Sequence, residues 1–382
     1  MSYTLTYIKS RLNAAIKNKI DMLVSSDDTI NAGVREAFSE IAFRSSKRTV
    51  QVSPYLFSDV YSYPAPQDLS GSMVTDIRPN NQSDNSGKEL ILRTPEEFYR
   101  NFDTFNFAVD DSDAYTKLLI SLPISDSTLT VAELDDTTGW SAFSASTTNV
   151  RLDSQNYMKG SSSISFDINA VSGTTAGIVS STIDTFDYTD YLYGTVFVWA
   201  FIKDSTNITD YKIRFGNDSS NYYEITTTTS HEGIPFQNGW NLLRFDMSSK
   251  TTTGSPTSTA GAYVALFMTK DVTKVSETGY AFDHIIFKTG KAYLISYYSA
   301  YPWKNTSGTY LLESTAETDY LTCTPDEFDI IFNKIVSLAA GEIGEDGIEG
   351  NASKKYGAKR ELYLASSPDE SKLLISTYYV FE

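Results

Sequence analysis

The chain has 382 residues, of which 41% are hydrophobic and 21% charged, a composition that excludes an intrinsically disordered protein and suits about two domains. A formal net charge of −17 argues against general nucleic-acid binding, because phosphate contacts require Lys and Arg. The single cysteine, Cys323, excludes an internal disulfide. No segment approaches the roughly 20 apolar residues of a membrane-spanning helix, and residues 1–20 are typical of an amphipathic helix rather than a signal peptide. We therefore expect a soluble protein made in a reducing cytosol.

The amino-terminal part predicts a helical hairpin followed by short strands. Apolar residues recur at intervals of three and four over 5–23 and again over 29–43, which defines one apolar face on each of two helices. The polar residues 25–28 separate these helices and can cap the second. Alternating apolar residues then predict strands near 50–55 and 60–63.

Two copies of one helix-start signal follow. Thr94 and Thr324 each precede Pro, two acidic residues and Phe, so that the threonine can cap the helix and the second acid can complete a capping box. The glycine-rich residues 341–357 predict a mobile loop whose acids lack the spacing of a calcium loop. The final 373–381 predict an exposed strand that a partner covers.

Two β-prone segments, 117–124 and 291–303, bracket sequence of a different character. We predict that they pair as the two halves of one β-hairpin and that residues 126–289 are a domain inserted between them. The predicted fold class is α+β, with a helical host domain and a small β-sheet (1–125 and 290–382) interrupted by an antiparallel β-sandwich.

The inserted region consists of short β-prone runs separated by Ser, Thr, Gly, Asn and Asp. About nine strands with no helical run between them predict a two-sheet antiparallel sandwich. The expected strands are 150–152, 163–168, 177–183, 195–202, 211–215, 222–227, 240–246, 263–268 and 280–287.

The order Gly139-Trp140, Gly160-Ser161, Asn238-Gly239-Trp240 and Tyr280-Ala281-Phe282-Asp283 resembles the jelly-roll domains of the carbohydrate-binding-module and laminin-G-like class. The resemblance implies a structural calcium held by Asp283 with Glu133 or Asp135; the alternative is that Asp283 only satisfies backbone donors. It also implies that Trp140, Trp199 and Trp240 stack on sugar rings, the alternative being that they belong to the core.

The sequence offers no catalytic site. His231 and His284 are the only histidines, both in the inserted domain, and Cys323 has no histidine nearby in the host sequence. No phosphate-binding, dinucleotide-binding or zinc motif occurs. We expect a protein that is not an enzyme and that has no catalytic, cofactor or metal residues, although a glycosidase with a carboxylate pair from distant strands stays open.

The host sequence, from the helical hairpin through Tyr61-Ser62-Tyr63-Pro64 to the segment at 319–321 before the last helix, is similar to the head-to-tail connector (neck adaptor) proteins of tailed bacteriophages. The resemblance implies a virion protein of the neck, made in the bacterial cytoplasm, that forms a ring of commonly twelve copies. It would bind the portal and tail proteins and let DNA pass through. The alternative is a glycan-binding head fibre or decoration protein. The basic group Lys354, Lys355, Lys359 and Arg360 suggests either a solvated surface or docking onto an acidic partner.

Overall fold

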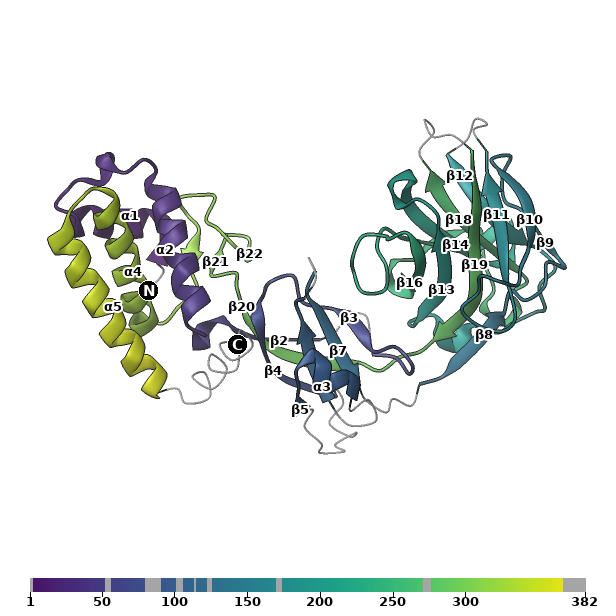
Figure 1. Ribbon diagram of the computed structural model, residues 1–382, viewed down its shortest axis with the longest axis horizontal. Helices are drawn as coiled ribbons and strands as arrows, with labels where there is room; N and C mark the ends of the chain where they lie inside the picture. The colour runs from purple at the N-terminus through teal and green to yellow at the C-terminus, as the bar shows by residue number, and fades with distance from the viewer. Residues whose placement is uncertain are drawn as a thin grey trace. The chain divides into compact units, whose positions relative to one another are not determined.

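The protein is described here by a computed structural model that covers residues 3–51, 56–79, 91–100, 106–112, 115–121, 126–169, 174–270 and 276–366 (Figure 1). The chain forms two compact units, one from Met1–Gln51, Ala65–Arg78 and Leu294–Glu382 and the other from Val52–Pro64 and Pro79–Tyr293. Within these described ranges, no helix is both long and apolar enough to cross a membrane. The predicted strand at 373–381 lies outside the described residues.

In the described residues, the first unit is built on four α-helices. They are α1 (Leu5–Ala15), α2 (Ser26–Glu40), α4 (Pro325–Glu342) and α5 (Asp346–Ser366). The predicted caps are confirmed: the Ser25 side chain accepts the backbone N–H of Asp28, and Thr324 and Glu327 form a reciprocal capping box. The helices share one core, in which Ile8, Val34 and Ile335 are fully buried. Helix α1 ends earlier than predicted, because Lys17 and Asn18 adopt left-handed backbone conformations.

Residues 346–357 do not form the predicted loop but the first half of α5. Ala352 and Tyr356, four positions apart, are buried against the core of the first unit. This packing outweighs the cost of the glycines in the helix, roughly 1 kcal/mol each relative to Ala. Within the basic group, Lys359 lies 2.5 Å from Asp329, whereas Lys354 and Lys355 are exposed.

Two small sheets complete the first unit. One joins β1 (Tyr3–Thr4), β23 (Tyr320–Leu321), β21 (Trp303–Lys304) and β22 (Tyr310–Leu311). The other has the order β2 (Lys47–Gln51), β20 (Tyr293–Ser299) and β4 (Leu69–Pro79). The buried ring of Trp303 belongs to the helical core, so the first of these sheets is packed onto the helices.

The predicted hairpin between 117–124 and 291–303 is wrong. Leu119 lies in β7 (Lys117–Ser121), which pairs with β3 (Ser62–Pro64) and β6 (Asn106–Asp110), whereas Ile295 lies in β20 and pairs with β2. Strand β6 precedes β7 by only a short connection, and closing a short loop costs little conformational entropy. The nearby strand therefore takes the place that we had assigned to a distant one. Strand β5 (Ile91–Leu92) completes this sheet by pairing in parallel with β6. Helix α3 (Pro95–Arg100) follows β5 in the chain, and Thr94 caps it as predicted.

The predicted antiparallel sandwich is confirmed, and all nine expected strands form. The first sheet has the order β10 (Thr147–Asp153), β11 (Ser163–Ile168), β19 (Glu277–Lys288), β13 (Thr195–Ile202) and β16 (Gly239–Asp246), and β8 (Thr128–Ala132) also pairs with β19. The second sheet has the order β17 (Thr251–Thr253), β15 (Asn221–Thr227), β14 (Ile208–Asp218), β18 (Tyr263–Lys270), β12 (Thr175–Ser180) and β9 (Trp140–Ala142). Strands β8, β9 and β17 are additional to the prediction. All described sandwich strands fall inside the predicted 126–289.

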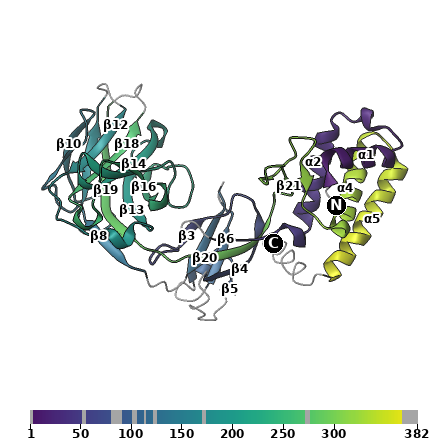
Figure 2. The ribbon, with the colours of Figure 1, turned by 180° about the vertical axis from the view of Figure 1, so that it is seen from behind.

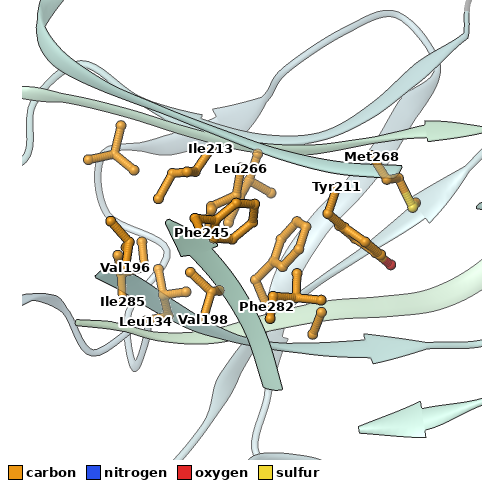
Figure 3. Close-up of a cluster of buried hydrophobic side chains, with 14 of the residues drawn as sticks. Leu134, Val196, Val198, Tyr211, Ile213, Phe245, Leu266, Met268, Phe282 and Ile285 are labelled. Atoms are coloured by element: carbon orange, nitrogen blue, oxygen red, sulfur yellow. The ribbon is translucent and has the colours of Figure 1, made fainter. Parts of the chain in front are cut away.

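The core of the sandwich lies between the two sheets (Figures 1 and 2). Figure 3 shows Val196, Val198 and Phe245 of the first sheet facing Ile213 and Leu266 of the second. Alternate residues of each strand point into this core, because successive side chains of a strand lie on opposite faces. The intervening residues point outward, and their chemistry decides what the sandwich can bind.

Candidate functional site

The outward side of the first sheet carries a group of aromatic rings. Val198 and Ala200 of β13 point into the core, so Trp199 and Phe201 point outward. Phe201 is directly opposite Trp240 of β16 in the strand pairing, and paired residues share a face of the sheet. All three rings are half-buried. We call Trp199, Phe201 and Trp240 the tryptophan face.

Trp240 is held in place from two sides. Its ring meets that of Phe201 in an edge-to-face contact, with ring centroids 5.5 Å apart. Its indole Nε1–H donates a hydrogen bond of 2.8 Å to the side-chain oxygen of Asn156, which comes from the loop between β10 and β11. The orientation of this indole is therefore fixed without any bound ligand.

The far end of the same outward surface is closed by another part of the second unit. Phe197 of β13 points to this side but is only 1% exposed, because the ring of Phe57 packs edge-on against it at 4.9 Å. Close by, Lys288 donates hydrogen bonds to the backbone oxygen and hydroxyl of Ser58, at 2.9 and 2.6 Å. The three rings of the tryptophan face, in contrast, are left partly exposed.

The 154–162 loop, between β10 and β11, borders the tryptophan face and is tied down by aspartates. Asp283 lies opposite Trp199 in the strand pairing, and its Oδ2 accepts the backbone N–H groups of Met158 and Lys159 at 2.7 and 2.8 Å. Asp135 Oδ1 accepts those of Ser161 and Ser162, both at 2.8 Å. Gly160, at φ +66°, allows this approach, because a Cβ there would lie 2.1 Å from the Asp135 carboxylate.

These contacts place backbone donors on two of the predicted metal ligands. Asp283 and Asp135 each accept two backbone N–H groups with one carboxylate oxygen, which is the alternative that the sequence left open for Asp283. The other carboxylate oxygen of Asp283 is buried and has no hydrogen-bond partner among the described residues. Burial raises the pKa of Asp283. Burial also acts to raise that of Asp135, but the N–H groups of Ser161 and Ser162 hold its pKa below the usual range. Glu133 is exposed, and among the described residues no group of three His, Cys, Asp or Glu side chains is arranged to bind a metal ion.

The remaining candidate residues are separate from one another. Burial lowers the pKa of His231 to about 4, and its backbone N–H donates to the backbone oxygen of Leu242 in β16. His284 occupies a left-handed position, at φ +53°, where the pairing of β13 and β19 shifts register. Cys323 is partly buried at the helical core, and burial raises the pKa of its thiol, as expected for an unreactive cysteine.

Trp140 does not join the other predicted tryptophans. It begins β9 in the second sheet and packs against the sandwich core. The outward side of that second sheet instead holds what we call the arginine cluster: Phe143, Arg214, Tyr222, Tyr263 and Phe267. Phe143 stacks on Phe267 at 4.1 Å, and the Arg214 guanidinium lies 4.7 Å from the centroid of the Tyr222 ring.

Sequence reasoning missed Phe201 and Asn156. The alternation of residues 195–202 contained a signal for Phe201, because a strand that buries Val196, Val198 and Ala200 must turn Phe201 to the same side as Trp199. Nothing local marked Asn156. Its role depends on a hydrogen bond to a residue 84 positions away in the sequence.

No protein-family model matches the sequence, and no curated protein is similar to it at a significant level. Solved structures that are similar over part of the chain include a family 30 carbohydrate-binding module of a Clostridium thermocellum cellulosomal cellulase (12% identity, 42% of this chain, 96% of that chain, TM-score 0.30). Another holds a family 22 module and the GH10 module of xylanase 10B from the same organism (14% identity, 42% of this chain, 28% of that chain, TM-score 0.27). A third is a module that recognises mannan (9% identity, 43% of this chain, 95% of that chain, TM-score 0.24). At these identities and TM-scores, the assignment of the fold rests on the strand pairing described above.

Proposed function

We propose that the sandwich is a carbohydrate-binding module and that the tryptophan face is its binding surface. The observation that carries the proposal is the joint outward orientation of Trp199, Phe201 and Trp240 on neighbouring strands, with the Trp240 indole fixed by Asn156. Sugar rings have apolar C–H faces that pack onto flat aromatic side chains, and fixed rings lose little entropy on binding. Three adjacent rings on a sheet suit an extended glycan chain better than a small compact ligand.

The test compares three tryptophans on two sheets. The unmodified protein is screened on a glycan array, and the affinity for a positive glycan is measured by calorimetry. We expect Trp240→Ala and Trp199→Ala each to weaken binding by about 30-fold or more, the effect of removing a central aromatic contact. Trp140→Ala is the matched control, because Trp140 packs at the core on the other sheet. Binding that survives loss of both Trp199 and Trp240 would contradict the proposal.

We further propose that the chain binds its glycan without chemical change. Neither histidine shares a described hydrogen bond with Cys323 or with a serine hydroxyl, so no nucleophile and base are assembled around them in the described residues. Incubation of the protein with a panel of polysaccharides should release no reducing ends. Release that is abolished by one Asp→Asn or Glu→Gln change would replace this proposal with that of a glycosidase.

A second candidate function concerns where the protein works, namely the neck of a tailed phage. What supports it is the element order of the first unit: the α1–α2 hairpin, strand β20, the acidic turn at 313–319 and the capped helix α4. In this proposal the first unit assembles as a homo-oligomeric ring that binds portal and tail proteins and surrounds passing DNA. The sandwich would then be the part of the virion protein that meets a glycan.

Cryo-electron microscopy of the particle would test this location directly. We expect density for the helices between portal and tail, together with co-purification of the protein and the portal. Density for the protein on the capsid surface would favour a head fibre or decoration protein instead. Particles that join head to tail normally in the absence of this protein would contradict the neck assignment.

A further inference from the structure

The 154–162 loop has an unusual number of its backbone N–H groups bound by aspartates of the sandwich. Asp153 Oδ1 accepts those of Gln155 and Asn156, at 3.0 and 3.1 Å. Asp283 and Asp135 accept four more, from Met158, Lys159, Ser161 and Ser162. Hydrogen bonds to a charged acceptor are stronger than those between neutral groups. The loop is therefore fixed at both ends and in its middle.

The anchors come from different parts of the fold. Asp153 ends β10, whereas Asp283 lies on the central strand β19 and Asp135 follows β8. Asp283 is fully buried, so its carboxylate is covered on the outward side of the first sheet. An anchor on a central strand cannot move unless the sheet itself deforms. The anchored loop thus has a defined position relative to β13 and β16, which carry the tryptophan face.

The Asn156 side chain connects the anchored loop to the tryptophan face. Asn156 is held through its backbone on both sides: its N–H donates to Asp153, and its carbonyl accepts the Ser163 hydroxyl at 2.7 Å. Its side-chain oxygen accepts the Trp240 indole N–H at 2.8 Å. The three aspartates thus hold the loop backbone, the loop backbone holds Asn156, and Asn156 holds the Trp240 indole.

We propose that Asn156 is a positioning residue for Trp240 and that Asp283 acts through it as a loop anchor. In this role Asp283 supplies an acceptor oxygen, because its Oδ2 accepts the backbone N–H groups of Met158 and Lys159. The ligand-dependent part rests on the proposed function, since Trp240 is taken to be a sugar contact. The positioning of the indole itself does not depend on that proposal.

Side-chain indole signals of ¹⁵N-labelled protein, recorded without ligand, test the positioning step. Asn156→Ala should shift the Trp240 N–H signal and speed its exchange with solvent, whereas Asn156→Asp keeps an acceptor and should preserve the protected signal. Gln155→Ala is the matched control, because Gln155 is the exposed neighbour in the same loop. Trp199 serves as the internal reference. A Trp240 signal that is unchanged in Asn156→Ala would overturn the inference.

The anchoring step is tested at Asp283. Asp283→Asn retains an acceptor oxygen and should leave the Trp240 signal protected, whereas Asp283→Ala should change it as Asn156→Ala does. If Asp283→Asn were as damaging as Asp283→Ala, and a calcium chelator reproduced the effect in the unmodified protein, Asp283 would be a metal ligand and the anchor role would be wrong. Asn156 lies in a partly exposed loop, so its variants keep the inference testable even if Asp283→Ala fails to fold.

Glycan affinity separates this inference from the proposed function. If the sandwich binds sugar, Asn156→Ala should weaken binding by about 3- to 10-fold, the effect of one lost hydrogen bond, and Asn156→Asp should restore most of it. A changed Trp240 signal in a protein that binds no glycan would support the positioning role and remove only the sugar-binding function. Unchanged affinity in a variant whose Trp240 signal has shifted would show that the fixed orientation does not matter for binding.

Discussion

The outward sides of the two sandwich sheets carry similar side chains in different arrangements. On the tryptophan face, Trp240 and Phe201 meet edge to face at an interplanar angle of 68°. In the arginine cluster, Phe143 and Phe267 stack at 8°. The Arg214 guanidinium also lies 4.9 Å from the Phe267 centroid and 5.5 Å from that of Phe143.

This difference shows why aromatic content alone does not identify a binding surface. A stacked pair covers one face of both rings, whereas an edge-to-face pair covers a face of only one. Within the arginine cluster the rings and the guanidinium satisfy one another, and Glu224 pairs with Arg214 at 2.6 Å. We infer that the arginine cluster stabilises the second sheet and that the tryptophan face is the one available to a ligand.

The largest effect is expected from a core residue, because both surfaces depend on the folded sandwich. Phe245 is fully buried between the sheets (Figure 3), so Phe245→Ala should lower the free energy of unfolding by about 3–5 kcal/mol. Phe201→Ala, on the same sheet but facing outward, should cost about half as much or less. Urea unfolding followed by circular dichroism measures both. Equal losses for the two variants would mean that the inward and outward assignments are wrong.

Acid should lower the free energy of unfolding through His231, which lies beside β16. Burial lowers the pKa of His231 to about 4, whereas an unfolded histidine titrates near 6.5. Between these values the unfolded chain binds a proton that the folded chain does not, so stability falls as the pH drops from about 6.5 towards 4. The upper limit of this loss is about 3 kcal/mol. Urea unfolding at pH 7 and pH 5 measures this loss, and the difference in free energy between the two pH values should be smaller for His231→Gln than for the unmodified protein. Equal differences in the two proteins would contradict a buried neutral imidazole.

Disruption of the arginine cluster should affect stability but not binding. Arg214→Ala removes a partly exposed ion pair and the contacts over three rings, for an expected loss of about 1 kcal/mol. Arg214→Lys keeps the charge but not the planar group and should recover only part of this. Thermal unfolding and glycan calorimetry on the same samples would measure the two effects. A large drop in glycan affinity would place the ligand on the second sheet instead.

The smallest effect is expected at a strongly exposed aromatic ring. Tyr193 is 84% exposed and precedes β13, and Lys250 Nζ lies 5.6 Å from the centroid of its ring. Tyr193→Ser should change the free energy of unfolding by no more than about 0.5 kcal/mol and leave glycan affinity unchanged. A clear loss of affinity in this variant would show that exposure, rather than the grouping of fixed rings, determines binding.

What the sequence misassigned and what it left open have a common origin. Segment 341–357 was predicted as a loop because it is rich in glycine and charged residues. In the structure, Ala352 and Tyr356 pack against the helical core, and this packing stabilises a helix. For Asp283 the resemblance implied a metal ligand, with the binding of backbone donors as the alternative. The loop that supplies its backbone donors becomes visible only when β10, β11 and β19 are side by side. In each case the deciding partner is distant in the sequence.

The sequence by itself determined the features that depend on near neighbours along the chain. Caps at Ser25 and Thr324, the helical stripes and the nine strands of the sandwich all follow from periodicities and hydrogen bonds within a few residues. Tertiary structure decided which strands became partners, so that Leu119 and Ile295 lie in different sheets. It also brought Trp199 and Trp240 onto one face while leaving Trp140 on the other sheet. Strand pairing joins residues far apart in the chain, and its outcome depends on which loops close and which surfaces can be buried together, neither of which a local pattern contains.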